Sequence, residues 1–181
     1  MTDPRQFSCN ETLRNALAVT IRHLRADDRE RIAKAVRQLD RESIYTRLFT
    51  YRSELTESGL DRIMRVDPQR EVALVVTAGA GNEEIVIGSG RYVVVDPNAT
   101  ERTAEVAFMV EEDYQGLGIA GRLLRHFADI ARDQGIAAFE ADVLAHNKSM
   151  LAVFARSGLP MRKRNEGGTV HVTLSLRGDP A

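Results

Sequence analysis

The stretch Asp113-Tyr-Gln-Gly-Leu-Gly-Ile-Ala-Gly121 separates two segments of different periodicity. Before it, residues 103–110 alternate in polarity and end in an apolar run, which predicts a strand. After it, apolar residues recur at helical spacing to about residue 131, and Gly135 stands where helices often end. Residues 138–144 then predict another strand. Such a unit is a crossover, in which the two strands run parallel and the connection is right-handed.

The glycines of this stretch favour a phosphate site. Gly116, Gly118 and Gly121 allow a tight turn that presents bare N–H groups at a helix N-terminus, where donors are unsatisfied and the helix dipole is positive. One alternative is a turn that simply needs glycine. Another is the dinucleotide fingerprint Gly-x-Gly-x-x-Gly, with Glu140 and Asp142 about 20 residues further on. Against that fingerprint, the turn does not follow its strand directly, and little chain remains for further βαβ units. A P-loop is excluded because no Gly-Lys-Ser/Thr follows.

A third interpretation also uses the glutamine. Gln115-x-x-Gly118-x-Ala120 resembles the Gln/Arg-x-x-Gly-x-Gly/Ala signature of GCN5-related N-acetyltransferases (GNAT), which cradles the pyrophosphate of coenzyme A. The resemblance continues in Ser43-Ile-Tyr45-Thr-Arg47, Ala104-Glu-Val-Ala-Phe108 and Ala141-Asp-Val-Leu144, followed by Asn147. These segments look like the acetyltransferase domain of bacterial protein lysine acetyltransferases, which modify acyl-CoA synthetases. The similarity covers about residues 41–176.

The resemblance implies a fold, a co-substrate and a binding site. The fold would be α/β, with a central mixed antiparallel and parallel sheet flanked by helices. Acetyl-CoA would be the co-substrate, and no metal is expected. The implied coenzyme-binding residues are Ala107, Phe108, Met109, Gln115, Gly116, Leu117, Gly118, Ile119, Ala120 and Asn147. Arg122 and Arg125 are further candidates for the coenzyme phosphates, although exposed helix arginines are more often solvated.

Glu105 is the candidate general base. On a strand it shares one face with Ala107 and Met109, and a carboxylate among apolar residues is costly unless it is wet or paired. Burial would raise its pKa towards a value useful for a general base. The alternative is a solvated carboxylate or an ion pair with Arg102. In the resembling lysine acetyltransferases, the glutamate of this segment is the base, and that role carries over to Glu105.

Other residues of the expected site are less specific. In many GNAT enzymes a tyrosine on the helix after the Asn147 position is the general acid, but Phe154 stands there and cannot donate a proton. The resembling lysine acetyltransferases also lack that tyrosine, so the departure favours this subfamily. Ser149 is a weak substitute. Tyr45 and Arg47 match the substrate wall of the family, or are simply an amphipathic tyrosine and a solvated arginine.

The remaining chain predicts one ordinary domain. We expect an acetyltransferase domain over 18–177 and an N-terminal arm over 1–17, of which Met1–Glu11 is expected to be poorly ordered. Helices at about 28–39, 40–49 and 56–64 are expected to form a wall over a cleft rather than a layer on the sheet. The expected strands are at 18–24, 71–77, 84–95, 103–110, 138–144, 162–164 and 169–176.

Composition excludes several other classes. The chain has 181 residues, with 25 Lys and Arg against 26 Asp and Glu, and no basic stripe typical of nucleic-acid binding. Cys9 is the lone cysteine, which excludes an internal disulfide and a cysteine-based zinc site, and the four histidines show no metal spacing. The absence of a membrane-length apolar run or a signal-peptide core predicts a soluble, cytoplasmic protein.

The leading prediction is therefore an N-acetyltransferase that moves the acetyl group of acetyl-CoA to the side-chain amine of a protein lysine, possible targets including an acyl-CoA synthetase. One alternative enzyme acetylates a small amine, such as a polyamine, an amino sugar or an amino acid. A different class is a non-catalytic regulator that binds acyl-CoA.

Overall fold

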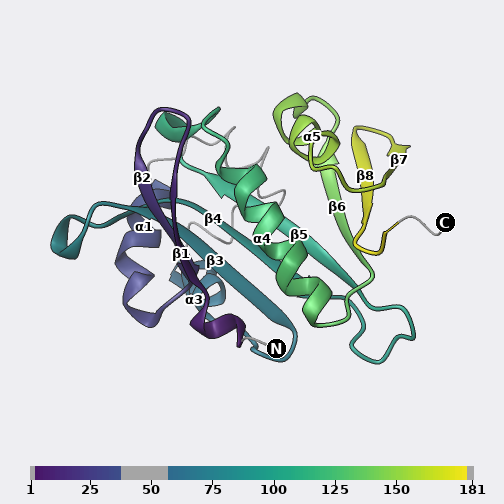
Figure 1. The fold of residues 1–181 in the computed structure, drawn as a ribbon, viewed down its shortest axis with the longest axis horizontal. Helices are drawn as coiled ribbons and strands as arrows, with labels where there is room; N and C mark the ends of the chain where they lie inside the picture. The colour runs from purple at the N-terminus through teal and green to yellow at the C-terminus, as the bar shows by residue number, and fades with distance from the viewer. Residues whose placement is uncertain (1–2, 38–56, 179–181) are drawn as a thin grey trace.

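The computed structural model describes residues 3–37 and 57–178. Its strands form one sheet in the order β1-β2-β3-β4-β5-β6-β8-β7 (Figure 1). The strands are β1 (Ser8–Thr12), β2 (Ala18–His23), β3 (Glu71–Ala78), β4 (Ile85–Val94), β5 (Thr103–Val110), β6 (Ala138–Leu144), β7 (Met161–Glu166) and β8 (Thr169–Ser175). The α-helices of the described residues are α1 (Arg29–Arg37), α3 (Glu57–Met64), α4 (Ile119–Asp133) and α5 (Lys148–Ala155).

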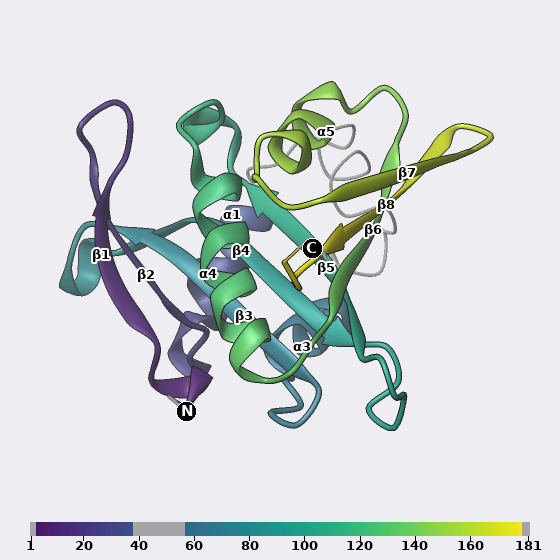
Figure 2. The same ribbon diagram turned by 45° about the vertical axis from the view of Figure 1, so that its right-hand side comes forward.

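Helices cover both faces of the sheet (Figure 2). On one face, Leu123 and Phe127 of α4 pack with Phe108 and Phe139 of β5 and β6, and all four side chains are at most 2% exposed. On the other face, the apolar residues of α1 and α3 pack against β3, β4 and β5; they include Ile32, Val36, Leu60, Val75 and Met109. Both faces of β3 are therefore buried, which explains its unbroken apolar sequence.

Two expectations about the first third of the chain are wrong. Ser8–Thr12 was expected to belong to a poorly ordered arm, but it forms β1 and pairs antiparallel with β2. Its polar residues fit an edge strand, where one side and one face meet water. The helices at 28–39 and 56–64 are confirmed as α1 and α3, yet they form a layer on the sheet. The helix expected at 40–49 and the residues Tyr45 and Arg47 lie outside the described residues.

The predicted crossover is confirmed. The strands β5 and β6 are parallel and α4 connects them, while every other neighbouring pair of the described sheet is antiparallel. The parallel pairing joins Thr103–Glu105 to Ala138–Glu140 and stops there. Beyond Glu105, β5 keeps β4 as its neighbour but has separated from β6. The sheet therefore opens into a gap just downstream of the candidate base.

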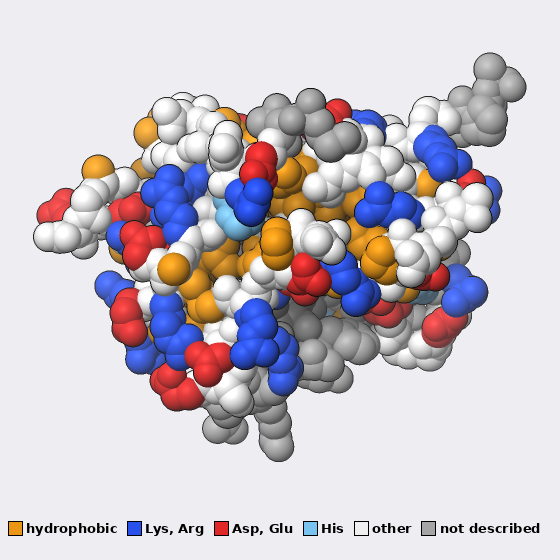
Figure 3. All heavy atoms as spheres, turned by 90° about the horizontal axis from the view of Figure 1, so that it is seen from below, with side chains coloured by type: hydrophobic (Ala, Val, Ile, Leu, Met, Phe, Trp, Pro, Cys, Tyr) orange, Lys and Arg blue, Asp and Glu red, His pale blue; other side chains and the backbone are white. Residues whose placement is uncertain are grey.

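The charged surface is mixed in sign. On the face shown in Figure 3, Lys and Arg side chains are interspersed with Asp and Glu, and no continuous basic stripe is visible. This agrees with the net charge of −1 and does not favour a nucleic-acid partner. Among the described helices, none has the length and apolar character needed to cross a bilayer.

Candidate active site

The glycine-rich loop enters α4 through two residues in the left-handed region. Gly116 has φ of 75° and Gly118 has φ of 88°, a conformation that glycine adopts with little strain. Gly118 is the N-cap residue of α4, and a Cβ placed there would lie 2.9 Å from Nη1 of Arg122. Gly121 was expected to belong to the turn, but it lies within the first turn of α4. The loop thus offers bare backbone at a positive helix end, which suits a pyrophosphate.

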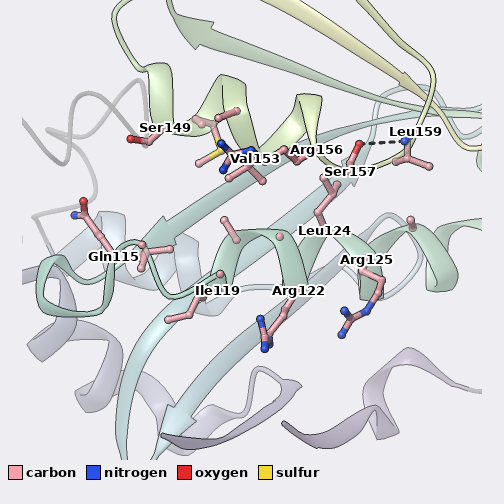
Figure 4. Close-up of a pocket in the computed structure, with 18 of the residues that line it drawn as sticks. Gln115, Ile119, Arg122, Leu124, Arg125, Ser149, Val153, Arg156, Ser157 and Leu159 are labelled. Atoms are coloured by element: carbon pink, nitrogen blue, oxygen red, sulfur yellow. Dashed lines mark hydrogen bonds between the residues drawn. The ribbon is translucent and has the colours of Figure 1, made fainter. Parts of the chain in front are cut away.

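A groove of about 810 Å³ runs from this loop between α4 and α5 (Figure 4). Ile119, Arg122 and Arg125 come from α4, while Ser149, Val153 and Arg156 come from α5 on the opposite wall. The predicted coenzyme residues that line it are Gln115, Gly116, Gly118, Ile119, Ala120 and Asn147. Leu117 instead packs against the core. The sheet has one parallel pair among its described strands, so the dinucleotide interpretation lacks its series of βαβ units.

Basic side chains surround the groove, and sequence reasoning found only part of them. Arg14, from the turn between β1 and β2, donates to the carbonyl of Gly116 at 3.4 Å. Lys148 and Arg156 of α5 also line the groove. No local signal points to Arg14, because only the pairing of β1 with β2 brings that turn to the loop. Lys148 could have been found, since it follows the helix cap Asn147 directly.

The two arginines predicted to reach phosphates are engaged elsewhere. Nε of Arg122 lies 2.8 Å from Oε2 of Glu11, and Nη2 of Arg125 lies 2.8 Å from Oε1 of the same carboxylate. Arg122 also donates to the carbonyl of Thr12 at 2.7 Å. Both side chains line the groove, so their contact with coenzyme phosphates stays a prediction.

A buried acid precedes the loop. Glu111 follows β5 directly and is 8% exposed. Burial is the main cause that raises its pKa above the ordinary value, and the charge of Asp113 adds to it. A raised pKa means that this acid keeps its proton to a higher pH than a fully exposed glutamate does.

The gap between β5 and β6 connects the groove to the candidate base. A second cavity of about 260 Å³ is lined by Glu105, Ala107 and Phe108, and it shares Asn147 and Met150 with the groove. A third cavity of about 140 Å³ shares Arg91, Ala107 and Phe108 with the second, and Met109 lines it as well. The fold therefore brings the predicted strand residues, the loop and Asn147 to neighbouring hollows that share lining residues.

Glu105 lies in solvent at the edge of the gap. Its side chain is exposed, which matches the alternative of a solvated carboxylate. The residues described contain no ion pair between Glu105 and Arg102, whose Nη1 donates instead to the carbonyl of Gln134 at 2.8 Å. A solvated carboxylate beside the gap can still accept a proton from an amine that reaches it.

Helix α5 begins at the N-cap residue Asn147 and contributes Phe154 to the core. The side chain of Asn147 accepts a hydrogen bond from the N–H of Met150 at 3.2 Å, which confirms the predicted N-cap. Phe154 is 1% exposed, and its ring centroid lies 6.2 Å from that of Phe108. Phe154 therefore packs in the core. Ser149 is exposed and lines the groove, whereas His146 is exposed and lines none of the three hollows.

Comparison with known proteins agrees with this geometry. The model of the acetyltransferase (GNAT) family matches residues 34–159. The chain is 34% identical over 143 residues to acetyltransferase PA5475 of Pseudomonas aeruginosa, covering 77% of this chain and 74% of that protein. It is also 34% identical over 131 residues to acetyltransferase Pat of Mycolicibacterium smegmatis, covering 72% of this chain and 38% of Pat.

A solved structure extends the similarity to nearly the whole chain. The GNAT domain of S. lividans PAT superposes with a TM-score of 0.81 and 30% identity, over 93% of this chain and 96% of that domain. The glycine-rich loop at the start of α4, the groove beside it and the gap between β5 and β6 thus occur in a chain whose sequence matches the family over more than half its length. The protein belongs to the GNAT family of acetyl-CoA-dependent acetyltransferases.

Proposed function

We propose that the protein transfers the acetyl group of acetyl-CoA to the side-chain amine of a protein lysine, with Glu105 as general base. The observation that carries this proposal is the position of Glu105, at the point where β5 and β6 separate and in a cavity that adjoins the coenzyme groove. The similarity to Pat and to the GNAT domain of PAT supports a protein acceptor.

The coenzyme supplies the acetyl group as a thioester, whose thiol of pKa about 8.5 leaves readily. The demanding steps therefore fall to the protein. A lysine amine, with an ordinary pKa of about 10.4, must lose a proton to attack. Glu105 accepts that proton directly or through one water. We further propose that the backbone N–H of Phe108, which points away from β4 where β5 has parted from β6, binds the pantetheine and polarises the thioester carbonyl.

The acceptor side of the gap is acidic. Glu105 and Glu140 are direct neighbours across β5 and β6, and Asp142 follows two residues later on the same face. The described residues show no ion pair for Glu105 or Glu140, while Asp142 Oδ1 lies 2.8 Å from Nδ1 of His171. Three carboxylates on one face produce a negative potential that attracts a cationic side chain. This favours a lysine acceptor.

The test is Glu105→Gln, which keeps the shape and removes the basicity. We expect acetyl-CoA to bind unchanged in isothermal titration, while turnover falls roughly 10²–10⁴-fold near neutral pH. The deficit should shrink as the pH rises, because more of the amine is then free. Glu101→Gln is the matched control, since Glu101 pairs with Arg177 at 2.7 Å and lines none of the three hollows. Wild-type turnover of Glu105→Gln across pH 6–9 would remove the general-base role.

The same acidic face would also attract a small polyamine, which is the second candidate acceptor. A lysate incubated with the protein and labelled acetyl-CoA separates the two. Label on lysines of a few proteins, acyl-CoA synthetases among them, supports the protein acceptor. Label confined to small amines favours the alternative, and label on neither would support a non-catalytic regulator.

A further inference from the structure

A thiol, a carboxylate and an imidazole converge outside the active site. Cys9 and Glu11 are two residues apart on β1, so their side chains leave the same face of the strand. That face meets His126 of α4. Sγ of Cys9 lies 3.5 Å from Nε2 of His126 and 4.0 Å from Oε1 of Glu11, and Nε2 of His126 contacts the same Oε1. None of the three has a part in the proposed acetyl transfer.

We propose that Cys9, Glu11 and His126 form a binding site for a divalent zinc-like cation. This site corrects the expectation that a lone cysteine excludes a cysteine-based zinc site, because the other ligands come from different residue types. One thiolate with a carboxylate and an imidazole is a donor set that zinc uses, and three protein ligands leave a fourth position for water. In tetrahedral zinc sites, sulfur and nitrogen ligands lie about 3.6 Å apart, given metal–ligand distances of about 2.3 and 2.0–2.1 Å. The Cys9–His126 separation of 3.5 Å already has that value.

The other two separations require small movements. The sulfur and the carboxylate oxygen must approach by about 0.4 Å, and the carboxylate oxygen and the imidazole nitrogen must part to about 3.4 Å. All three side chains are partly buried, and the ring of Phe7 packs against that of His126 with centroids 5.1 Å apart. This packing limits the positions of the imidazole and favours a preformed site.

Two protons compete with the cation for its ligand atoms. Burial, and next the charge of Glu11, raise the pKa of the Cys9 thiol, so the metal has to displace the thiol proton. His126 must also present Nε2 without its proton, because it cannot donate to Glu11 and bind metal through one atom. Binding therefore releases protons and strengthens as the pH rises.

Two arginines also oppose the cation, and they make the site testable. Arg122 contacts Oε2 of Glu11, which leaves Oε1 for the metal and orients the carboxylate as an outer-shell partner. Arg125 contacts Oε1 itself, but its side chain is 59% exposed and can turn into water. Because Arg125 also lines the coenzyme groove, metal binding changes the partner of a groove arginine. Repulsion by the two cations makes the site weaker than a four-ligand structural site.

The experiment titrates untagged full-length protein with Zn²⁺ against a chromophoric chelator, and with Co²⁺ followed by absorption. We expect one ion per chain, proton release, a sulfur-to-cobalt charge-transfer band, and slower reaction of Cys9 with a thiol reagent when Zn²⁺ is present. Cys9→Ser and His126→Asn should weaken Zn²⁺ binding by more than the roughly 10–100-fold that outer-shell changes cause. Arg125→Ala should instead tighten it about fivefold, because one opposing charge is lost.

The matched control is His171→Asn, which removes a histidine paired with a carboxylate elsewhere and should bind Zn²⁺ as the wild type does. Zinc binding that persists undiminished in Cys9→Ser, or cobalt binding without the charge-transfer band, would overturn the proposal. If Cys9→Ser fails to fold, the wild-type protein decides: Zn²⁺ that leaves the reactivity of Cys9 unchanged refutes the site.

Discussion

Replacing Gly118 by Asp and by Asn tests whether the loop binds phosphate. The two side chains have nearly the same size and both tolerate the left-handed region better than most residues, so they differ mainly in charge. At φ of 88° either residue is strained, and its Cβ meets Nη1 of Arg122 at 2.9 Å. Arg122 can yield because the contact is with the end of a long side chain. We expect both variants to fold with a melting temperature lower by about 2–4 °C per kcal/mol of strain.

The charge of Gly118→Asp sets the difference in coenzyme affinity. A carboxylate about 4 Å from one phosphate charge repels it by about 1 kcal/mol in water and about 4 kcal/mol at an effective dielectric constant of 20. These limits correspond to about fivefold and about 10³-fold weaker binding. The groove is open to solvent, so we expect Gly118→Asp to bind acetyl-CoA about 10–100-fold more weakly than Gly118→Asn.

Isothermal titration of both folded variants with acetyl-CoA measures this ratio. High ionic strength should narrow it, because salt screens the repulsion between exposed charges. Equal affinities for Gly118→Asp and Gly118→Asn at low salt would show that no phosphate approaches the loop. Equal affinities of both variants and the wild type would remove the loop from coenzyme binding altogether.

Three further predictions concern the scaffold. Burial disfavours the ionised form of Asp28, but hydrogen bonds from Arg22 at 2.8 Å and from the Arg25 amide outweigh it and lower its pKa. Its contribution to stability is therefore fully present above about pH 3.9 and is lost progressively as the pH falls from there through the lowered pKa. Urea unfolding should show Asp28→Asn destabilised by about 3–5 kcal/mol at pH 7, and the difference from the wild type should shrink as the pH is lowered below about 3.9. Asn147→Ala should lower the free energy of unfolding by about 1 kcal/mol because the N-cap is lost, and Asn147→Ser should restore the stability. If Asn147→Ser restores the stability but not the affinity for acetyl-CoA, Asn147 also contacts the coenzyme. Gly90→Ala should lower the free energy of unfolding by about 1–3 kcal/mol, because its Cβ would meet the Phe127 ring at 2.7 Å. Thermal unfolding measures this, and an unchanged melting temperature would contradict the packing.

Much of the region around the glycine-rich loop can be predicted from local sequence. The alternation of residues 103–110, the glycines of the loop and the apolar face of the following helix place β5, the left-handed turn and α4 where the structure has them. Asn147 caps α5 as predicted, because capping depends on residues within one helical turn. These features are decided by backbone preferences and short-range periodicity, which a sequence displays directly.

The separation of β5 from β6 cannot be deduced from the residues of these strands. Nothing in the alternation of Ala104–Phe108 tells how far a strand stays paired with a neighbour that lies more than 30 residues away. The exposure of Glu105 could not be decided from the sequence for the same reason. Strand alternation gives the face on which a side chain lies, whereas its burial depends on what the rest of the chain packs against that face.

Tertiary structure alone decided the contacts made by β1. The polar segment Ser8–Thr12 has no apolar pattern that predicts a strand, and it becomes one because β2 offers it an open edge. That pairing carries Arg14 to the glycine-rich loop and Glu11 to Arg122 and Arg125. It also sets Cys9 beside His126, which lies 117 residues away in the sequence. Local preferences carry no information about such distant partners, so only the folded chain shows the side-chain clusters that they form.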